Sequence, residues 1–400
     1  MLGPRQTCQS RCEKKHTKMF IFESLWPMLR LHQILGIFPC IKDKVEEGKY
    51  ILRPSKGIYH FMKYFGTLFL AYIPHYIFNI ILAINHEQSL MEFLYTSKIM
   101  DSPKNFMIMI SIIVCILCQH LIMMTCIWKL RFHLCQLQDF LNEKSFSMSK
   151  NAWYDWGLRL IVTLFLMTNL ILALGMSYAH IDDPDLYSNK FLIILLVLST
   201  SFIIFITDSP VICFLIILVN MFKTIHNWTQ SLTKMSLEHQ NELVWSETQD
   251  FIVHWKKVRS LLSFPIFILV LNTLFISVLI LYRGIAFFTD TSTDTSLIMV
   301  FAGYISVGIT LAYSLAFINF YAQMINEEIT ALLENLHQFS RKDEINGNVS
   351  NHQSILRSLI QWQGFTGYEF FTLGKPLLSS IVSAFMTYLI VLVQFQTSQK

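Results

Sequence analysis

Seven long runs of apolar residues constrain the possible folds of this chain more than any other feature. An α-helix needs about 20 predominantly apolar residues to cross a bilayer, and each run is at least that long. The runs cover residues 58–84, 106–128, 157–179, 191–222, 262–287, 297–321 and 376–395. They are continuous, whereas the strands of a membrane barrel alternate apolar with polar residues. Since a helix satisfies its own backbone in hydrocarbon, we predict an all-α membrane protein with seven transmembrane helices.

The composition fits a chain whose solvent is the lipid bilayer. Charged residues make up 14% of the sequence and hydrophobic residues 53%, whereas a soluble domain carries about 25% charge. A soluble chain of this composition would expose large apolar patches. The net charge of +4 is too small to indicate a nucleic-acid partner, and 14 glycines are too few for a Gly-rich nucleotide-binding enzyme.

The distribution of Lys and Arg predicts the orientation in the membrane. Of the 31 basic residues, 23 lie before the first run or in the connections after the second, fourth and sixth runs. Only 4 lie in the other connections and the tail. Positive residues concentrate on the cytoplasmic side, so we expect a cytoplasmic N-terminus and an extracellular C-terminus. Residues 1–18 are polar and basic, unlike a signal peptide, and we expect 19–38 to form an interfacial or cytoplasmic helix.

The connections on the cytoplasmic side contain further helical patterns. Apolar residues recur at helical spacing in 232–255 and 325–339, and 355–373 is predicted to be an apolar and aromatic helix. The chain is expected to form one membrane domain with cytoplasmic extensions. Its predicted divisions are an N-terminal region (1–57), a six-helix bundle (58–321), a helical base (322–375), the last transmembrane helix (376–395) and an extracellular tail (396–400).

Motifs of enzymes and metal sites are absent from the sequence. No hydrolase, metalloprotease or phosphate-loop motif occurs, so we predict no catalytic residue, no cofactor and no enzymatic activity. None of the eight cysteines lies in a predicted external segment, which argues against disulfides. Cys8, Cys12 and His16 share a helical face, but their spacing is a weak zinc pattern, and no metal site is predicted.

Polar residues inside two apolar runs each permit two interpretations. His120 is either a functional group, as ionisable residues in membranes often are, or a neutral histidine bonded to a neighbouring helix, which is the commoner case. The sequence Asp208-Ser209-Pro210 either kinks the fourth helix and lines a wet cavity or marks where that helix leaves the bilayer.

The last run carries a stripe of small and polar side chains. Ser380, Ser383, Ala384, Thr387, Val391 and Gln394 recur at helical spacing and share one face. Small residues let membrane helices pack closely, which is the usual explanation of such a stripe. Alternatively, the stripe faces water in a pore that several copies surround. Gln394 favours a pore, because an unpaired amide in hydrocarbon is costly.

The end of this run resembles a known receptor signature. The segment from Thr387-Tyr388 through five apolar residues to Gln394-Phe395 is similar to the motif that closes insect gustatory receptors, and all four fixed positions match. The segments Leu25-Trp-Pro27-Met-Leu29 and Gly36-Ile-Phe-Pro39 also resemble that family's N-terminal region.

The resemblance implies a gustatory chemoreceptor in the plasma membrane of gustatory sensory neurons. It implies a ligand-gated, non-selective cation channel, built as a homo- or hetero-tetramer with other gustatory receptors. The last helix would line the pore, with Gln394 and Phe395 at the gate and Val391 and Thr387 beside the pathway. Leu389 stands where sugar receptors of the family often have Glu, which argues against a typical sugar ligand. Bitter compounds, a fructose-like ligand and internal sensing remain open.

The resemblance also implies an outward-facing ligand pocket in the six-helix bundle. The predicted topology places four candidate wall residues near the outer ends of the third, fifth and sixth helices. These residues are Tyr178, Tyr282, Arg283 and Tyr304. Aromatic faces with a few donors suit a small organic tastant, although an interfacial aromatic belt would explain each residue equally well.

The alternatives are two other classes of receptor and a transporter. A G-protein-coupled receptor usually has an external N-terminus and carries Asp-Arg-Tyr and Asn-Pro-x-x-Tyr motifs, none of which fits this sequence. An odorant receptor would share the predicted architecture. A transporter would more often contain internal repeats and paired broken helices.

Overall fold

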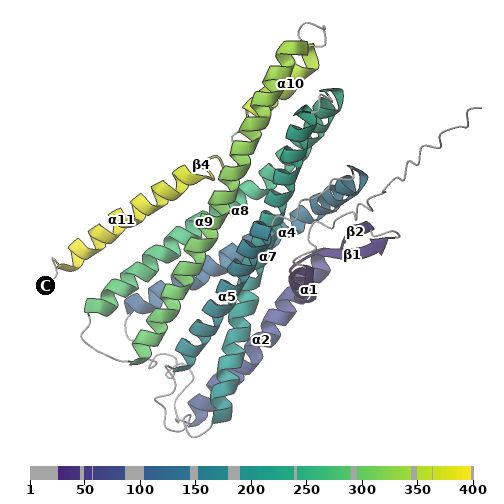
Figure 1. Ribbon diagram of the computed structural model, residues 1–400. Coiled ribbons are helices and arrows are strands. Elements are labelled where there is room, and N and C mark those ends of the chain that lie inside the picture. Colours follow the sequence, from purple (N-terminus) through teal and green to yellow (C-terminus); the bar gives the residue numbers. More distant parts are fainter. Residues whose placement is uncertain are drawn as a thin grey trace, which may run out of the picture.

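The described part of the chain is all-helical apart from two short hairpins (Figure 1). The computed structural model describes residues 26–45, 49–55, 57–85, 103–144, 152–178, 190–237, 241–289, 295–343, 349–362 and 364–397. Nine helices lie in these ranges: α1 (Trp26–Ile34), α2 (Gly57–Asn85), α4 (Pro103–Lys144), α5 (Ala152–Tyr178), α7 (Lys190–Leu237), α8 (Asn241–Thr289), α9 (Thr295–Asp343), α10 (Val349–Ile360) and α11 (Lys375–Thr397).

Each of the seven predicted membrane segments lies in one of these helices. They correspond to α2, α4, α5, α7, α8, α9 and α11, apart from residue 179, which lies outside the described residues. Within the described part of the chain, four segments are long and apolar enough to cross a bilayer. These are Trp156–Leu174, Asp208–Met235, Val244–Phe275 and Ile305–His337.

The two hairpins were not predicted. Strand β1 (Cys40–Val45) pairs antiparallel with β2 (Lys49–Pro54), and β3 (Thr366–Gly367) pairs antiparallel with β4 (Phe371–Thr372). The sequence of β1 places Lys, Asp and Lys in succession, so it lacks the apolar alternation that identifies a strand. The β1–β2 hairpin instead derives its position from the buried side chains of Cys40 and Leu52 and from the packing of β2 on α4.

The predicted helix over 355–373 is wrong in its second half. Helix α10 ends at Ile360, and the chain then forms the β3–β4 hairpin. Gly364 has φ +73°, and Tyr368 and Glu369 have φ values of 48° and 65°. This left-handed region is incompatible with a continuing α-helix. We call residues 364–374, which connect α10 to α11, the neck.

Three helices are much longer than a bilayer is thick. Helices α7, α8 and α9 contain 48, 49 and 49 residues, or roughly 70 Å at 1.5 Å per residue, whereas the hydrocarbon core is about 30 Å thick. Each therefore extends well beyond the membrane. The first part of α7 exposes large apolar side chains at Ile194, Leu198 and Phe202, as expected where a helix meets lipid.

The second half of α7 lies in the interior of the protein. Every residue from 211 to 229 is buried, although an amphipathic helix at a protein surface buries only one stripe. Trp228 meets Phe251 of α8 edge to face, with ring centroids 4.9 Å apart. We call this part of the protein, where α4, α8 and α9 pack on α7, the base.

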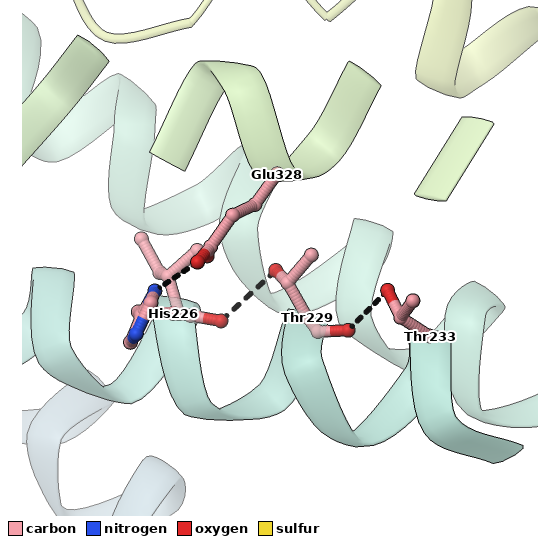
Figure 2. A network of polar contacts seen from close by, with 5 residues as sticks. His226, Thr229, Thr233 and Glu328 are labelled. Atoms are coloured by element: carbon pink, nitrogen blue, oxygen red, sulfur yellow. Dashed lines mark hydrogen bonds and ion pairs between the residues drawn. The ribbon is translucent and has the colours of Figure 1, made fainter. Parts of the chain in front are cut away.

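Polar side chains of the base are accommodated by pairing. His226 of α7 lies with its Nδ1 2.5 Å from Oε1 of Glu328 of α9 (Figure 2). One turn further, Thr229 Oγ1 donates to the carbonyl of Ile225 at 3.0 Å, and Thr233 repeats this bond to Thr229. Unpaired polar groups in such a core would be costly, so these pairs let the base bury polar residues.

Helix α1 is fixed to the base by a buried histidine. The side chain of His32 is fully buried, and its Nδ1 lies 2.7 Å from the carbonyl oxygen of Met28. Burial lowers the pKa of His32 to about 4, against weaker opposing effects of the carbonyls of Met28 and Ser209. The histidine is therefore neutral at neutral pH, and its Nδ1–H donates to Met28.

The buried aromatic pair in the base predicts a stability effect. Trp228→Ala removes a side chain that is 1% exposed, and large-to-small changes of this kind cost about 3–5 kcal/mol because a cavity remains. We expect thermal unfolding of the purified receptor at a clearly lower temperature. Phe320→Ala is the control, because Phe320 is 54% exposed. An equal shift in both variants would contradict the assignment of α7 to the core.

Candidate functional site

Helix α11 carries the four residues predicted to form the pore and gate. Thr387, Val391 and Gln394 are exposed on the single chain, whereas the side chain of Phe395 lies outside the described part. Thr387 Oγ1 donates to the carbonyl of Ser383 at 2.9 Å, and Ser380 makes the same bond to Pro376 at 3.0 Å. Because these hydroxyls bond to their own helix, the stripe can face water, lipid or another helix without leaving a hydroxyl donor unsatisfied.

The position of α11 depends on its first turn. In Figure 1, α11 (yellow) leaves the rest of the protein at the neck and runs beside the bundle without entering it. Its main contacts are with α8 and α9. Lys375, the first residue of α11, lies 3.7 Å from Glu327 of α9, an exposed pair that contributes little by itself.

The neck is bonded to α9 through two asparagines. The N–H of Gly374 donates to Oδ1 of Asn319 at 2.9 Å, a buried bond. Asn326 donates from Nδ2 to the carbonyl of Leu373, and its Oδ1 accepts from Nε1 of Trp362, both at 3.4 Å. The two amides therefore hold the last two residues of the neck and the Trp362 ring just before it.

The neck is also packed on α7 and α8. The ring of Phe365 is buried against Phe222 of α7, with centroids 4.4 Å apart. The N–H of Tyr368 donates to Oγ of Ser263 of α8 at 2.7 Å. The neck thus contacts the three longest helices of the protein.

A cluster of polar residues connects α5, α7 and α9 inside the bundle. The hydroxyls of Thr168 and Thr310 are 2.6 Å apart. With the amide of Asn169 turned so that Nδ2 faces the carboxylate of Asp208, the two groups bond at 2.8 Å. Polar residues within apolar runs were the sequence signal for this cluster, and only Asp208 among them was identified in advance.

The surroundings of α7 change at Asp208-Ser209-Pro210. Helix α7 continues through Pro210 without a break. Asp208 lies 18 residues after the start of α7 at Lys190, or about 27 Å along the axis, close to the hydrocarbon thickness. The fully buried half of α7 then begins at Ser209. The sequence therefore lies between a half of α7 with exposed apolar side chains and a half that is buried on every side.

The predicted ligand-binding residues lie on three separate helices. Tyr178 is the last residue of α5, Tyr282 and Arg283 lie in α8, and Tyr304 lies in α9. Their side chains, like that of His120, fall outside the described part. Cys8, Cys12 and His16 also lie outside the described residues.

Comparisons with known proteins agree on one family and one fold. A family model described as "7tm Chemosensory receptor" matches residues 25–399. Comparison with curated protein sequences finds no match. The structure of the insect olfactory receptor OR5 from Machilis hrabei in complex with eugenol is similar, with a TM-score of 0.58, 14% sequence identity, and coverage of 94% of this chain and 100% of that chain.

A second structure of the same receptor gives the same result. The insect olfactory receptor OR5 from Machilis hrabei aligns with a TM-score of 0.59 and 14% identity over 93% of this chain and 98% of that chain. The likeness confirms the predicted class of fold, a multi-pass helical membrane protein.

The contact between Asn169 and Asp208 predicts different effects of two substitutions. The turned Asn169 amide has two acceptors, Asp208 and the carbonyl of Phe165. Asp208→Leu removes the first of these and leaves a buried N–H without its acceptor, which costs about 1–3 kcal/mol. Asp208→Asn keeps an oxygen acceptor, so we expect a smaller loss of thermal stability in the purified receptor. Equal losses in the two variants would show that Asn169 does not depend on this oxygen.

Proposed function

The chain belongs to the 7tm chemosensory receptor family, and on this basis we propose that it is a gustatory receptor acting as a ligand-gated, non-selective cation channel. Membership of the family makes the chain a multi-pass membrane receptor rather than an enzyme. The proposal adds the stimulus, a small tastant, and the mode of action, conduction of cations through the receptor itself.

The exposure of α11 is the observation that carries the channel proposal. Val382 and Ile390 are 56% and 58% exposed, and side chains on the other faces are exposed or half-buried. An apolar helix so weakly covered by its own chain requires lipid or further copies around it. One such helix cannot enclose a pore, so we propose four subunits, each contributing α11. The assembly is a homotetramer or a heterotetramer with other gustatory receptors.

The proposed gate consists of Gln394 and Phe395, with Val391 and Thr387 lining the pathway. Adjacent residues of a helix point about 100° apart, so rotation or tilting of α11 exchanges the two gate side chains. Four Phe395 rings at a constriction of the pore would exclude water and block ions. Gln394 would present amide oxygens that replace part of an ion's hydration shell. No charge lies on the stripe, which fits weak discrimination among small cations.

We place the ligand pocket in the outer half of the bundle, within residues 58–321. Tyr178, Tyr282, Arg283 and Tyr304 are its proposed wall residues, and their aromatic faces and donors suit a small organic molecule. Leu389 favours a bitter compound or another ligand that is not a typical sugar. In the proposed orientation the N-terminus and residues 322–375 are cytoplasmic, and residues 396–400 are extracellular. The proposed site of expression is the plasma membrane of gustatory sensory neurons.

An odorant receptor is the second candidate, because the similar solved structures are those of an olfactory receptor, one of them in complex with eugenol. The complete Thr387–Phe395 motif favours the gustatory assignment. Recordings from cells that express the chain, with a panel of bitter compounds, sugars and volatile phenols, separate the two candidates by the class that evokes current.

The gate proposal predicts a ligand-independent effect of Phe395→Ala. Removing the ring weakens a hydrophobic block, so we expect a basal current several-fold above that of the wild type at equal surface expression. Phe385→Ala, the same change elsewhere on α11, is the control and leaves the basal current unchanged. Gln394→Ala is expected to alter ion selectivity. Unchanged basal current in Phe395→Ala, with normal selectivity in Gln394→Ala, would leave only a packing role for the stripe.

The assembly proposal predicts the mass of the purified particle. Four copies of a 46.7 kDa chain, corrected for bound detergent, give the expected value by mass photometry or light scattering. Co-expression of a tagged and an untagged chain would co-purify both. A particle with a single subunit that still conducts in liposomes would refute the assembly.

A further inference from the structure

The two asparagines that hold the neck lie close to the start of the long helix α11. Gly374, whose N–H bonds to Asn319, directly precedes the first residue of α11. Helix α11 contains 23 residues and is therefore about 35 Å long. A tilt of about 10° at the neck would displace the far end, where Gln394 lies, by about 6 Å. Small changes at Asn319 are thus amplified at the end of the helix.

We propose that Asn319 and Asn326 are positioning residues that couple α9 to α11, so that a shift or rotation of α9 reorients the last helix through the neck. The proposal rests on the proposed function only in assigning the pore to α11. The coupling consists of the bonds from these amides to Gly374, Leu373 and Trp362.

The neck has little room to absorb such a movement. A Cβ atom on Gly364 would lie 2.5 Å from Oδ1 of Asn326, and one on Gly374 would lie 2.7 Å from Oε1 of Gln323. Both distances are shorter than van der Waals contact allows, so the neck backbone lies directly against α9. The β3–β4 pairing and the bond from the N–H of Leu373 to the carbonyl of Phe365 at 2.7 Å stiffen it further. A closely packed contact transmits displacement.

Helix α9 also reaches into the bundle on its opposite side. Thr310 bonds to Thr168 of α5 at 2.6 Å, and Asn319 follows nine residues later, about 180° around the helix. The same helix therefore contacts the membrane bundle through one face and the neck through the other. Movement of the bundle around Thr310 has a direct mechanical route to α11.

A pair of matched variants tests the coupling. Asn319 and Asn220 are both buried and both donate from Nδ2 to the carbonyl four residues earlier, at 2.8 and 2.7 Å. Asn319 also bonds to the neck, whereas the bond of the Asn220 amide stays within α7. Asn319→Leu and Asn220→Leu therefore each remove one bond of the same kind within a helix, and only Asn319→Leu also removes the bond to the neck.

The first measurement is amide hydrogen exchange of the full-length receptor in detergent, in peptides covering 364–377. Loss of its acceptor should accelerate exchange of the Gly374 N–H about tenfold in Asn319→Leu, and Asn220→Leu should match the wild type there. The second measurement is basal current at equal surface expression. We expect a change of at least about threefold in Asn319→Leu and none in Asn220→Leu. If Asn319→Leu does not reach the surface, Asn326→Ala, which removes the other contacts from a half-buried position, takes its place.

The outcomes separate the two proposals. Unchanged exchange at Gly374 in Asn319→Leu would show that Asn319 does not hold the neck. Faster exchange with unchanged current, while Phe395→Ala raises the current, overturns the coupling and leaves the channel function standing. Absence of current in the wild type and in Phe395→Ala refutes the proposed function itself, and the exchange data still decide whether Asn319 holds the neck.

Discussion

The complete burial of the second half of α7 is the constraint on which the rest of the structure depends. Nineteen consecutive residues, 211–229, are buried regardless of their polarity. A helix can be covered on every side only if other helices extend alongside it over the same length. The lengths of α8 and α9, the docking of α1 and α10, and the packing of Phe365 on Phe222 all serve this purpose.

The same helices meet two different solvents along their length. In the membrane half, large apolar side chains such as Leu198 are exposed, since lipid accepts them. In the base, polar side chains such as His226 are buried and paired. An unpaired polar group is costly wherever water cannot reach it. Because α7 and α9 run through both halves as continuous helices, the two halves are mechanically connected.

Helix α11 is the exception to this packing. It is attached at one end through the neck and contributes little to the core of its own chain. A helix attached in this way can change its direction at a smaller energetic cost than one buried among neighbours, because few packed contacts have to be broken. The neck joins the closely packed helices to the weakly packed α11. The hydrogen bonds of Asn319 and Asn326 therefore lie where the direction of α11 is set.

The sequence by itself determined the seven membrane helices, the class of fold and the family motif at Thr387–Phe395. An apolar run is a local property, and in lipid the backbone leaves a continuous apolar segment no alternative to a helix. The four gate and pore residues could be named for the same reason, since the motif is contiguous, although their roles stay proposals.

Only the tertiary structure decided how α11 is held, which half of α7 is buried on every side and that 364–374 contains a hairpin. Each of these depends on partners far apart in the sequence. Gly374 meets Asn319 across 55 residues, and Asp208 meets Asn169 from another helix. Periodicity of 355–373 predicted a helix, but the left-handed backbone at Gly364 and Tyr368, fixed by contacts with α8 and α9, prevailed. Side-chain pairing and backbone strain are set by packing, and a pattern along the chain does not encode which helices will meet.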